Sequence, residues 1–375
     1  MDERKMRRLK NSIYAYITGR FIEGQMELDM LSKGALKKIL HVRIAKLIKE
    51  NDLPPLSAEE KAEIDKVYKG YPLSSYEYHR VYKGLSGKFY PEYMPEDLYY
   101  CYIEDYFSDK EASRYIDNKC YYPKMFAGMK QPETIVFRMG GVWLDADYNI
   151  ISPHEVLMAL SRSNGDLIMK IAENSERSYG VFLMKENEVI NSFSKNIKKI
   201  PKSEDVIVQR VIKQHPDYAK LNPGSVNAYR VISFLNSDTN AVEILKLSIR
   251  IGIDEHISNT GGRGGVLAGV NENGELTPCA YGLDCKCYYK HPVYGYKFGD
   301  ITVPFVDRVI EYVKKGHPMV SRFKIISWDL GVDEEGDPVL METNLTMSGI
   351  LYNQLVDGPL FGNHTKQILK KVFKK

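Results

Sequence analysis

Long apolar runs are missing from this 375-residue sequence, and cysteine is scarce. No stretch approaches the roughly 18 to 20 uninterrupted apolar residues that a membrane-spanning helix needs. Polar and charged residues interrupt the basic start, where a signal peptide would have a clean apolar core. The five cysteines are odd in number and form no pair of Cys-x-x-Cys knuckles, which argues against a disulfide framework or a structural zinc site. The sequence therefore predicts a cytosolic protein.

A bulk positive charge is missing as well. Lys and Arg number 52 against 49 Asp and Glu, a net charge of +3. Residues 1–50 carry twelve basic and six acidic residues, so the remainder of the chain has a net charge of −3. This main body offers no basic surface of the kind that nucleic acids need, and nucleic-acid binding is not expected.

The leading basic segment has helical periodicity. In Lys33–Glu50, apolar residues recur every three or four positions with lysines and an arginine between them. Two interpretations fit: a helix packed on the body with a solvated basic face, or peripheral contact of residues 1–50 with an anionic membrane surface or lipid-linked substrate. A polar break at 51–57 precedes another expected helix from about Ala58.

Tyrosine is abundant in the next segment. Residues 71–107 hold ten tyrosines. Such amphipathic rings indicate loops and short helices packed on a larger body, and the alternative is a sugar-binding surface.

From about residue 130 the sequence changes to short alternating segments typical of strands. Gly140-Gly141 separates the first two and predicts a hairpin. Ser152, Pro153 and Glu155 carry the pattern of a helix start, so a helix should run to about Ser161. Further strands are expected at 166–171, 180–185, 205–211, 225–235, 241–251, 265–270 and 276–280, with a helix over 303–315, a hairpin near 323–344 and a basic helix at the end. Locally paired strands with inserted helices predict the α+β class rather than a doubly wound parallel sheet.

The segment KIISWDLGVDEEGDPVLMETN, residues 324–344, contains the most informative pattern. If Val332 pairs with Val339 across a turn at 333–338, Asp329 lies opposite Glu342 and Ser327 opposite Asn344. Asp329, Glu342 and Asn344 then share a polar face, with opposed Cβ atoms about 5 Å apart. The apolar face is formed by Trp328, Leu330, Val332, Val339 and Met341.

Two opposed carboxylates repel each other, so a fold that opposes them normally supplies a cation or a shared proton. Oxygen ligands of this kind suit Mg²⁺, which takes one or two carboxylates together with water and phosphate oxygens. The alternative is an exposed polar face on an ordinary hairpin.

Asp329 and the Glu342-Thr343-Asn344 triplet resemble the magnesium motif of the ATP-grasp ligase superfamily. The resemblance implies an ATP-grasp fold, in which two α+β lobes clamp ATP, preceded here by an N-terminal helical segment. On this basis we expect a helical segment at 1–70, a tyrosine-rich lead-in at 71–129, a lid lobe at 130–210 and a C-terminal lobe with the metal-binding hairpin at 211–375. ATP and two Mg²⁺ ions are the implied ligands.

Lys170 and the loop after it fit the same resemblance. The family has a strand lysine that reaches the α/β phosphates, followed by a small-residue loop over the triphosphate. Here the loop offers Ser175, Ser178 and Gly180, although it is poorer in glycine than the family pattern. A second family lysine lies roughly 50 residues earlier, and Lys119 in Asp-Asn-Lys stands there.

A strand at 206–211 resembles the family's hinge between the lobes. The resemblance implies that backbone groups at Gln209, Arg210 and Val211 read the adenine edge. His215 is a candidate for the ribose, with a plain surface histidine as the alternative.

Further stretches resemble the branch of the superfamily associated with sugar transfer and surface polysaccharides: residues 82–107, 117–126, 211–231, 250–266 and 291–295. Arg230 and Arg250 lie mid-strand beside alternating apolar residues, which predicts that they reach the cleft and bind a phosphoryl or carboxylate group. The alternative for each is an ion pair with an acidic neighbour. Possible substrate contacts are Asn259, Gly261, Gly262 and Arg263, in a polar loop that could be a plain connector, and His291.

The resemblance implies an ADP-forming carboxylate ligase. A substrate carboxylate would attack the γ-phosphate, and an amine or hydroxyl acceptor, on a sugar, amino acid or cell-surface polysaccharide precursor, would attack the acyl phosphate. Two alternatives are a phosphotransferase that leaves the phosphoryl group on its substrate and a catalytically degenerate nucleotide-binding scaffold.

Overall fold

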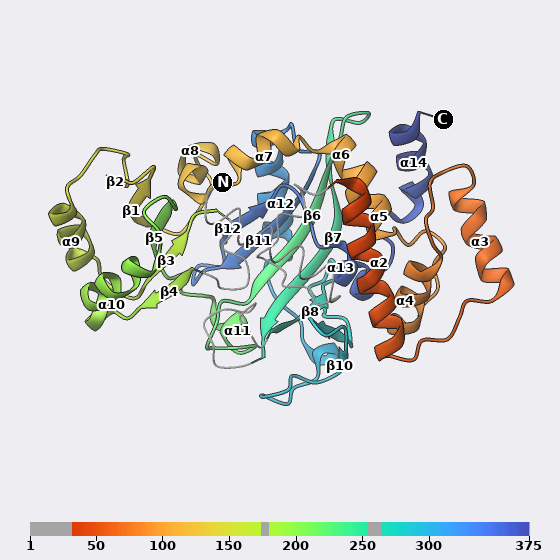
Figure 1. Cartoon of the computed structure of the whole chain (residues 1–375). Coiled ribbons are helices and arrows are strands. Elements are labelled where there is room, and N and C mark those ends of the chain that lie inside the picture. Colours follow the sequence, from red (N-terminus) through yellow and green to blue (C-terminus); the bar gives the residue numbers. More distant parts are fainter. Residues whose placement is uncertain (1–31, 174–179, 254–263, 375) are drawn as a thin grey trace.

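The chain folds around two antiparallel sheets, which lie side by side in Figure 1. The structure, a computed structural model, describes residues 32–173, 180–253 and 264–374. Every strand pairing in these residues is antiparallel, and helices are inserted between the hairpins. The predicted α+β class is therefore confirmed.

The smaller sheet has five strands in the order β2-β1-β5-β3-β4. Its strands are β1 (Thr134–Met139), β2 (Val142–Asp145), β3 (Leu167–Ile171), β4 (Val181–Met184) and β5 (Val206–Arg210). Helices α9 (Pro153–Arg162) and α10 (Val189–Asn196) pack on it around a separate core. The expected capping box is present, since Ser152 and Glu155 bond each other's backbone N–H groups at the start of α9.

The larger sheet has seven strands in the order β10-β9-β8-β7-β6-β11-β12. They are β6 (Ala228–Asn236), β7 (Ala241–Gly252), β8 (Gly265–Gly269), β9 (Ala280–Gly282), β10 (Cys287–Tyr288), β11 (Ile325–Val332) and β12 (Pro338–Asn344). One face packs against α12 (Val306–Gly316) and α8 (Tyr122–Met125). The helices before residue 108 and after residue 349 cover the other face.

These covering helices include α2 (Lys33–Glu50), whose apolar side chains are buried at three- and four-residue spacing. Tyr78, Tyr82, Tyr93 and Tyr99 are fully buried, which confirms packing as the main use of the tyrosine-rich segment. The other helices include α3 (Ala58–Tyr68), α4 (Glu77–Ser86), α5 (Glu96–Leu98), the π-helical η2 (Tyr99–Ile103), α6 (Glu104–Phe107), α7 (Lys110–Ile116), η3 (Lys119–Tyr121), α11 (Pro216–Ala219), α13 (Ile350–Asp357) and α14 (Thr365–Phe373). No helix in this described part of the chain is both long and apolar enough to cross a membrane.

Two expectations for residues 270–290 are wrong. The expected strand at 276–280 is reduced to an isolated bridge between Val270 and Leu276, and β8 pairs instead with β9. This antiparallel edge brings Cys279 and Cys287 together as a disulfide, which the odd cysteine count did not predict. The two cysteines are brought together by the pairing of β9 with β10, which their spacing in the sequence does not reveal.

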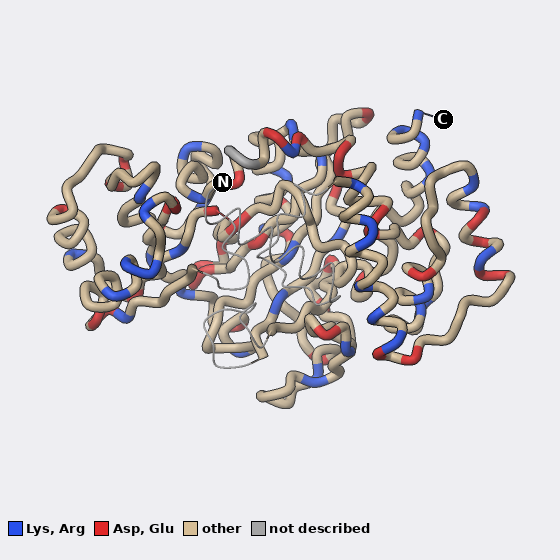
Figure 2. Tube along the Cα trace, viewed as in Figure 1, with Lys and Arg blue, Asp and Glu red and all other residues tan. Residues whose placement is uncertain are grey.

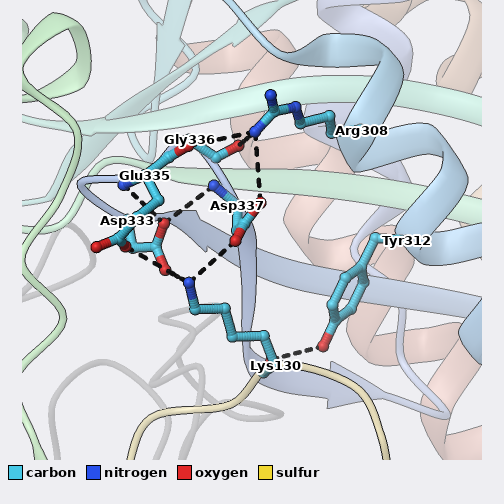
Figure 3. Close-up of polar contacts among 7 residues, drawn as sticks. All are labelled: Lys130, Arg308, Tyr312, Asp333, Glu335, Gly336 and Asp337. Atoms are coloured by element: carbon cyan, nitrogen blue, oxygen red, sulfur yellow. Dashed lines mark hydrogen bonds and ion pairs between the residues drawn. The ribbon is translucent and has the colours of Figure 1, made fainter.

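Both chain crossings between the two sheets contact the β11–β12 hairpin near its turn. On the first crossing, the Lys130 ammonium group forms ion pairs with Asp333, Glu335 and Asp337 (Figure 3). Its carbonyl accepts from the Tyr312 hydroxyl at 2.7 Å and from the Leu340 N–H. On the second crossing, the His215 N–H donates to Val332 O at 3.0 Å. This end of the hairpin therefore holds the smaller sheet against the larger sheet at two points.

Candidate active site

The polar residues of the β11–β12 hairpin lie where their pairing predicted. Asp329 is opposite Glu342, and Ser327 is opposite Asn344. Beyond Asp329 the expected register is wrong, because a β-bulge at Met341 pairs Leu330 with Leu340 and Val332 with Pro338. Leu340 therefore enters the core in place of the half-exposed Met341.

A row of polar side chains crosses four strands of the sheet. Glu342 pairs with Asp329, Asp329 with Arg230, and Arg230 with Ser248. Side chains alternate along a strand, so Arg230 and Ile232 share a face, and Ile232 packs in the core with the N-terminal helices. The row thus lies on the face that those helices cover further along the sheet.

Arg230 holds Asp329 with two hydrogen bonds. Its Nε and Nη2 donate to the two carboxylate oxygens at 2.5 and 2.7 Å, and both side chains are about nine-tenths buried or more. Arg250 lies further off, with Nη1 4.0 Å from Asp329 Oδ2. The alternative stated for the arginines, an ion pair with an acidic neighbour, is what the structure shows for Arg230. Substrate contact by either arginine stays a prediction.

Lys119 performs the same task for Glu342. Its ammonium group, in a residue only 4% exposed, donates to Glu342 Oε1 at 2.6 Å. Burial acts to raise the pKa of Glu342, but the charge and hydrogen bond of Lys119, with the charges of Arg230 and Lys170, lower it overall. Glu342 is therefore ionised at neutral pH.

Lys170 completes the cluster from the smaller sheet. It lies on β3 opposite Val181 and Ile207, and its side chain makes no hydrogen bond or ion pair within the described residues. Burial and the neighbouring charge of Lys119 lower its pKa to about 8 against the opposing pull of Glu342. Among the described residues, the Lys170 ammonium group thus has no ion-pair partner of its own.

The cluster carries an excess of positive charge. Four basic side chains, Lys119, Lys170, Arg230 and Arg250, meet two carboxylates, Asp329 and Glu342. Such a site attracts a compact, strongly anionic ligand.

The oxygen donors fit Mg²⁺ in kind. Glu342 Oε2 and Asn344 Oδ1 accept no hydrogen bond within the described residues, while Asn344 Nδ2 donates to Ser327 O at 3.5 Å. A carboxylate and an amide oxygen on one strand face, next to Asp329, are hard ligands of the type Mg²⁺ takes. The described residues contain no group of three His, Cys, Asp or Glu side chains that could hold a metal ion by themselves.

The loop between β3 and β4 lies only partly within the described residues. Ser175 and Ser178 fall outside them. Gly180 closes the loop at a φ of +70°, and its carbonyl accepts the Ile171 N–H at 3.0 Å. A Cβ at this position would collide with the Ile171 side chain, so only glycine fits.

The expected adenine-reading strand is β5. The Arg210 N–H donates to Glu133 O and the Val211 N–H to Asp166 O, so both are used inside the sheet. The Gln209 side chain reaches Pro132 O at 3.4 Å, and the Arg210 side chain pairs with Glu133. Adenine recognition at 209–211 stays a prediction.

The two candidate histidines both have structural contacts. His215 Nδ1 accepts the Asp217 N–H at 3.2 Å and caps α11, with its ring 5.0 Å from Phe305. His291 is 1% exposed and donates from Nε2 to Gly252 O at 2.8 Å. Ribose and acceptor contacts by these rings are untested. Asn259, Gly261, Gly262 and Arg263 lie outside the described residues.

Several residues that position the site carry no signal in the sequence pattern. The Tyr122 hydroxyl contacts Thr343 Oγ1 at 2.9 Å and accepts its N–H, fixing the opposite face of the Glu-Thr-Asn triplet. Asn118 donates to Asp205 at 2.8 Å, and the Lys119 N–H bonds Ala172 O, which ties the lysine to the end of β3. Glu104 accepts the Met347 N–H at 2.7 Å just after the triplet. Of these, only Asn118 was marked, by its place before Lys119.

Comparisons with known proteins agree with this geometry. The family of sugar-transfer associated ATP-grasp proteins matches residues 100–370. No curated protein matches the sequence.

Solved structures with a similar fold include the biotin carboxylase domain of 2-oxoglutarate carboxylase from Hydrogenobacter thermophilus, with a TM-score of 0.44 at 11% identity over 72% of this chain and 48% of that chain. L-amino acid ligase from Bacillus licheniformis has a TM-score of 0.39 at 12% identity over 69% of this chain and 48% of its own. D-alanyl-alanine synthetase A from Vibrio cholerae has a TM-score of 0.40 at 13% identity over 71% and 67%. The chain thus spans about half the length of the first two.

The family match extends over most of the chain and contains Lys119, Lys170, Asp329, Glu342 and Asn344. Together with the two antiparallel sheets and the polar row on the larger one, it confirms the ATP-grasp fold. The chain belongs to the sugar-transfer associated ATP-grasp family.

Proposed function

We propose that the protein is an ATP- and Mg²⁺-dependent carboxylate ligase that joins a carboxylate to an amine or hydroxyl acceptor. A substrate carboxylate oxygen attacks the γ-phosphorus of ATP, the bond to the β–γ bridging oxygen breaks, and ADP leaves. The acceptor then attacks the acyl carbon, phosphate departs, and the acceptor's proton goes to solvent. The family to which the chain belongs supports a sugar, amino acid or cell-surface polysaccharide precursor as the substrate class.

The observation that carries the proposal is the meeting of Lys119, Lys170 and Glu342 between the two sheets. Lys119 contacts Glu342 directly, and the charges of both lysines act on its carboxylate. These residues come from three separate parts of the chain. A purely structural ion pair needs only two of them, and the second, partly buried lysine is explained by an anionic ligand.

Each residue has a distinct proposed task. Lys119 and Lys170 bring positive charge to the phosphates, which phosphoryl transfer needs more than covalent help. Arg230 fixes the Asp329 carboxylate so that its orientation survives loss or gain of ligands. Asp329, Glu342 and Asn344 would hold Mg²⁺. When bound, the metal neutralises charge that develops on the β- and γ-phosphate oxygens.

The test is ADP release measured with a panel of carboxylates and nucleophilic acceptors, singly and together. We expect release to depend on both substrates and a condensed product to appear by mass spectrometry. A stable phosphorylated product without condensation would favour the phosphotransferase, and inertness across a broad panel with intact ATP binding would favour the scaffold.

Asn344→Ala provides the matching variant. We expect turnover to fall at least about 100-fold, because one of the proposed oxygen ligands of Mg²⁺ is lost. Asn273→Ala, in the exposed β-turn after β8, is the control and should keep full activity. Equal turnover of the two variants would contradict the assigned site.

A further inference from the structure

A short hairpin projects from the edge of the seven-stranded sheet. After β10 the chain continues outward, Lys290 bridges Lys297, and the Gly295 N–H closes the turn on His291 O at 2.9 Å. In Figure 1 this segment, next to the label β10, extends beyond the rest of the larger sheet. We call residues 289–298 the tip hairpin.

The tip hairpin exposes apolar side chains. Tyr289 is 67% exposed, Val293 56% and Tyr294 41%, and they are among the most exposed large apolar residues of the described chain. Such a concentration at one projecting turn differs from the scattered apolar residues of an ordinary surface.

The tip is held rigidly in this exposed state. The buried His291 ring donates from Nε2 to Gly252 O, and its Nδ1 accepts the N–H groups of Val293 and Tyr294 at 3.2 and 3.1 Å. Burial lowers the pKa of His291, which keeps the ring neutral and able to accept. These hydrogen bonds fix the backbone of the turn, so the side chains of Val293 and Tyr294 stay at the surface.

Two lysines stand behind the tip. Lys290 and Lys297 face each other across the hairpin, and neither forms an ion pair within the described residues. Like charges directly opposite destabilise a hairpin, and an anionic partner would relieve the repulsion. Figure 2 shows the outermost turn free of charged residues, with lysine behind it.

We propose that the tip hairpin docks the protein on an anionic phospholipid surface. Val293 and Tyr294 enter the headgroup boundary, where aromatic and aliphatic side chains are favoured, and Lys290 and Lys297 contact the anionic headgroups. The contact of His291 with Gly252, two residues beyond Arg250 on β7, places this surface beside the end of β7 that carries the arginine. The inference stands independently of the proposed reaction.

The experiment measures flotation of the full chain with vesicles of phosphatidylcholine alone and of phosphatidylcholine with phosphatidylglycerol. We expect binding only to the mixed vesicles, and its loss at high salt. Lys290→Glu/Lys297→Glu should weaken binding at least about 20-fold, since each surface lysine near an anionic leaflet adds about fivefold. Val293→Ser/Tyr294→Ser should weaken it at equal net charge.

Two charge-matched controls keep the result specific. Lys195→Glu/Lys198→Glu changes exposed lysines of the lid, and Lys46→Glu/Lys49→Glu changes exposed lysines of α2. Both should bind as the wild type does, and unchanged thermal melting shows that each variant is folded. Absence of vesicle binding by the wild type, or equal binding by all variants, overturns the proposal, as does a loss confined to the α2 variant.

Discussion

Arg230 donates two charge-assisted hydrogen bonds to Asp329, and both residues are buried from water. Removing one partner of such a pair leaves the other charge buried and uncompensated. We expect Arg230→Met to lower the free energy of unfolding by about 3 kcal/mol, measured by urea denaturation.

Arg210→Met is the matched control. Arg210 pairs with Glu133 at 2.7 Å, but the Glu133 side chain is 60% exposed. Its loss should cost less than about 1 kcal/mol. Similar losses for the two variants would mean that Asp329 is solvated or finds another partner.

Lys170 gives a pH dependence at the scale of one amine. With a pKa of about 8 it is charged at pH 7 and mostly neutral at pH 9. A phosphate group favours the charged form of Lys170, so at pH 9 the lysine must take up a proton when ATP binds. We expect ATP affinity, measured by equilibrium dialysis, to be about tenfold weaker at pH 9 than at pH 7.

Lys170→Arg tests that assignment, because arginine keeps its charge throughout this range. Its ATP affinity should vary little between the two pH values. A wild-type affinity that does not change with pH would show that Lys170 is away from the phosphates.

At the scale of elements, the β11–β12 turn joins the smaller sheet to the larger sheet. Lys130→Met removes the ion pairs with Asp333, Glu335 and Asp337 but keeps the backbone contacts of residue 130. Because the Lys130 side chain is 43% exposed, we expect little change in melting temperature.

The expected signature is local. Hydrogen exchange followed by mass spectrometry should accelerate at 126–133 and 333–337 in Lys130→Met. Lys314→Met, which removes an exposed lysine of α12, should leave both segments unchanged. Global acceleration in Lys130→Met would instead assign the cluster to overall stability.

The same hairpin shows how far sequence reasoning reached. Alternation alone placed Asp329, Glu342 and Asn344 on one face, because the side-chain period of a strand is fixed. The bulge was missed because Leu340 and Met341 are both apolar and either could fill the core. The tighter turn uses Gly336 at a φ of +78°, a conformation that becomes necessary only once the register is known.

Helix α13 was missed for a different reason. Gly349 precedes it in a left-handed conformation without any side-chain cap, so no start signal exists. The helix buries two polar residues, Asn353 and Gln354, whose partners Ser248 and Tyr82 lie far away in sequence. Tertiary hydrogen bonds of this kind stabilise the helix and are invisible to local patterns. The contact of Lys119 with Glu342 is equally long-range; family resemblance assigned both residues to the ATP site, but nothing in the sequence predicted that they touch.

At the scale of the whole molecule, Glu104 couples stability to pH. Burial raises its pKa to about 7, against the opposing charge of Lys110 and the hydrogen bonds from the Met347 and Ser348 backbone. The folded state therefore holds a proton that the unfolded state releases, so stability falls as the pH rises towards 7 and above. Relative to Glu104→Gln, the wild type should lose about 2 kcal/mol of unfolding free energy between pH 5.5 and 8.

Chemical denaturation at several pH values measures this difference. Glu111→Gln, an exposed carboxylate on α7, is the control and should run parallel to the wild type. Parallel curves for Glu104→Gln would mean that Glu104 is hydrated in the folded protein.

The basic helix α2 pairs with three acids on the rest of the chain, of which Asp97 and Glu96 are buried. Lys33 pairs with Asp105 at 2.7 Å, His41 with Asp97 at 3.1 Å and Arg43 with Glu96 at 3.4 Å. Its apolar side joins the same core as the sheet residues Ile232 and Phe234. Part of the positive charge at the start of the chain is thus used internally.

Because α2 is attached in this way, the start of the family match and the start of the packed core are different positions in the chain. The family match begins at residue 100, whereas in the described part of the chain the packed core already includes α2. A fragment cut at residue 100 would retain every candidate catalytic residue and yet lose one wall of its own interior. The helices at 33–86 are therefore no detachable module, and an exchange of catalytic lobes between relatives must carry them along.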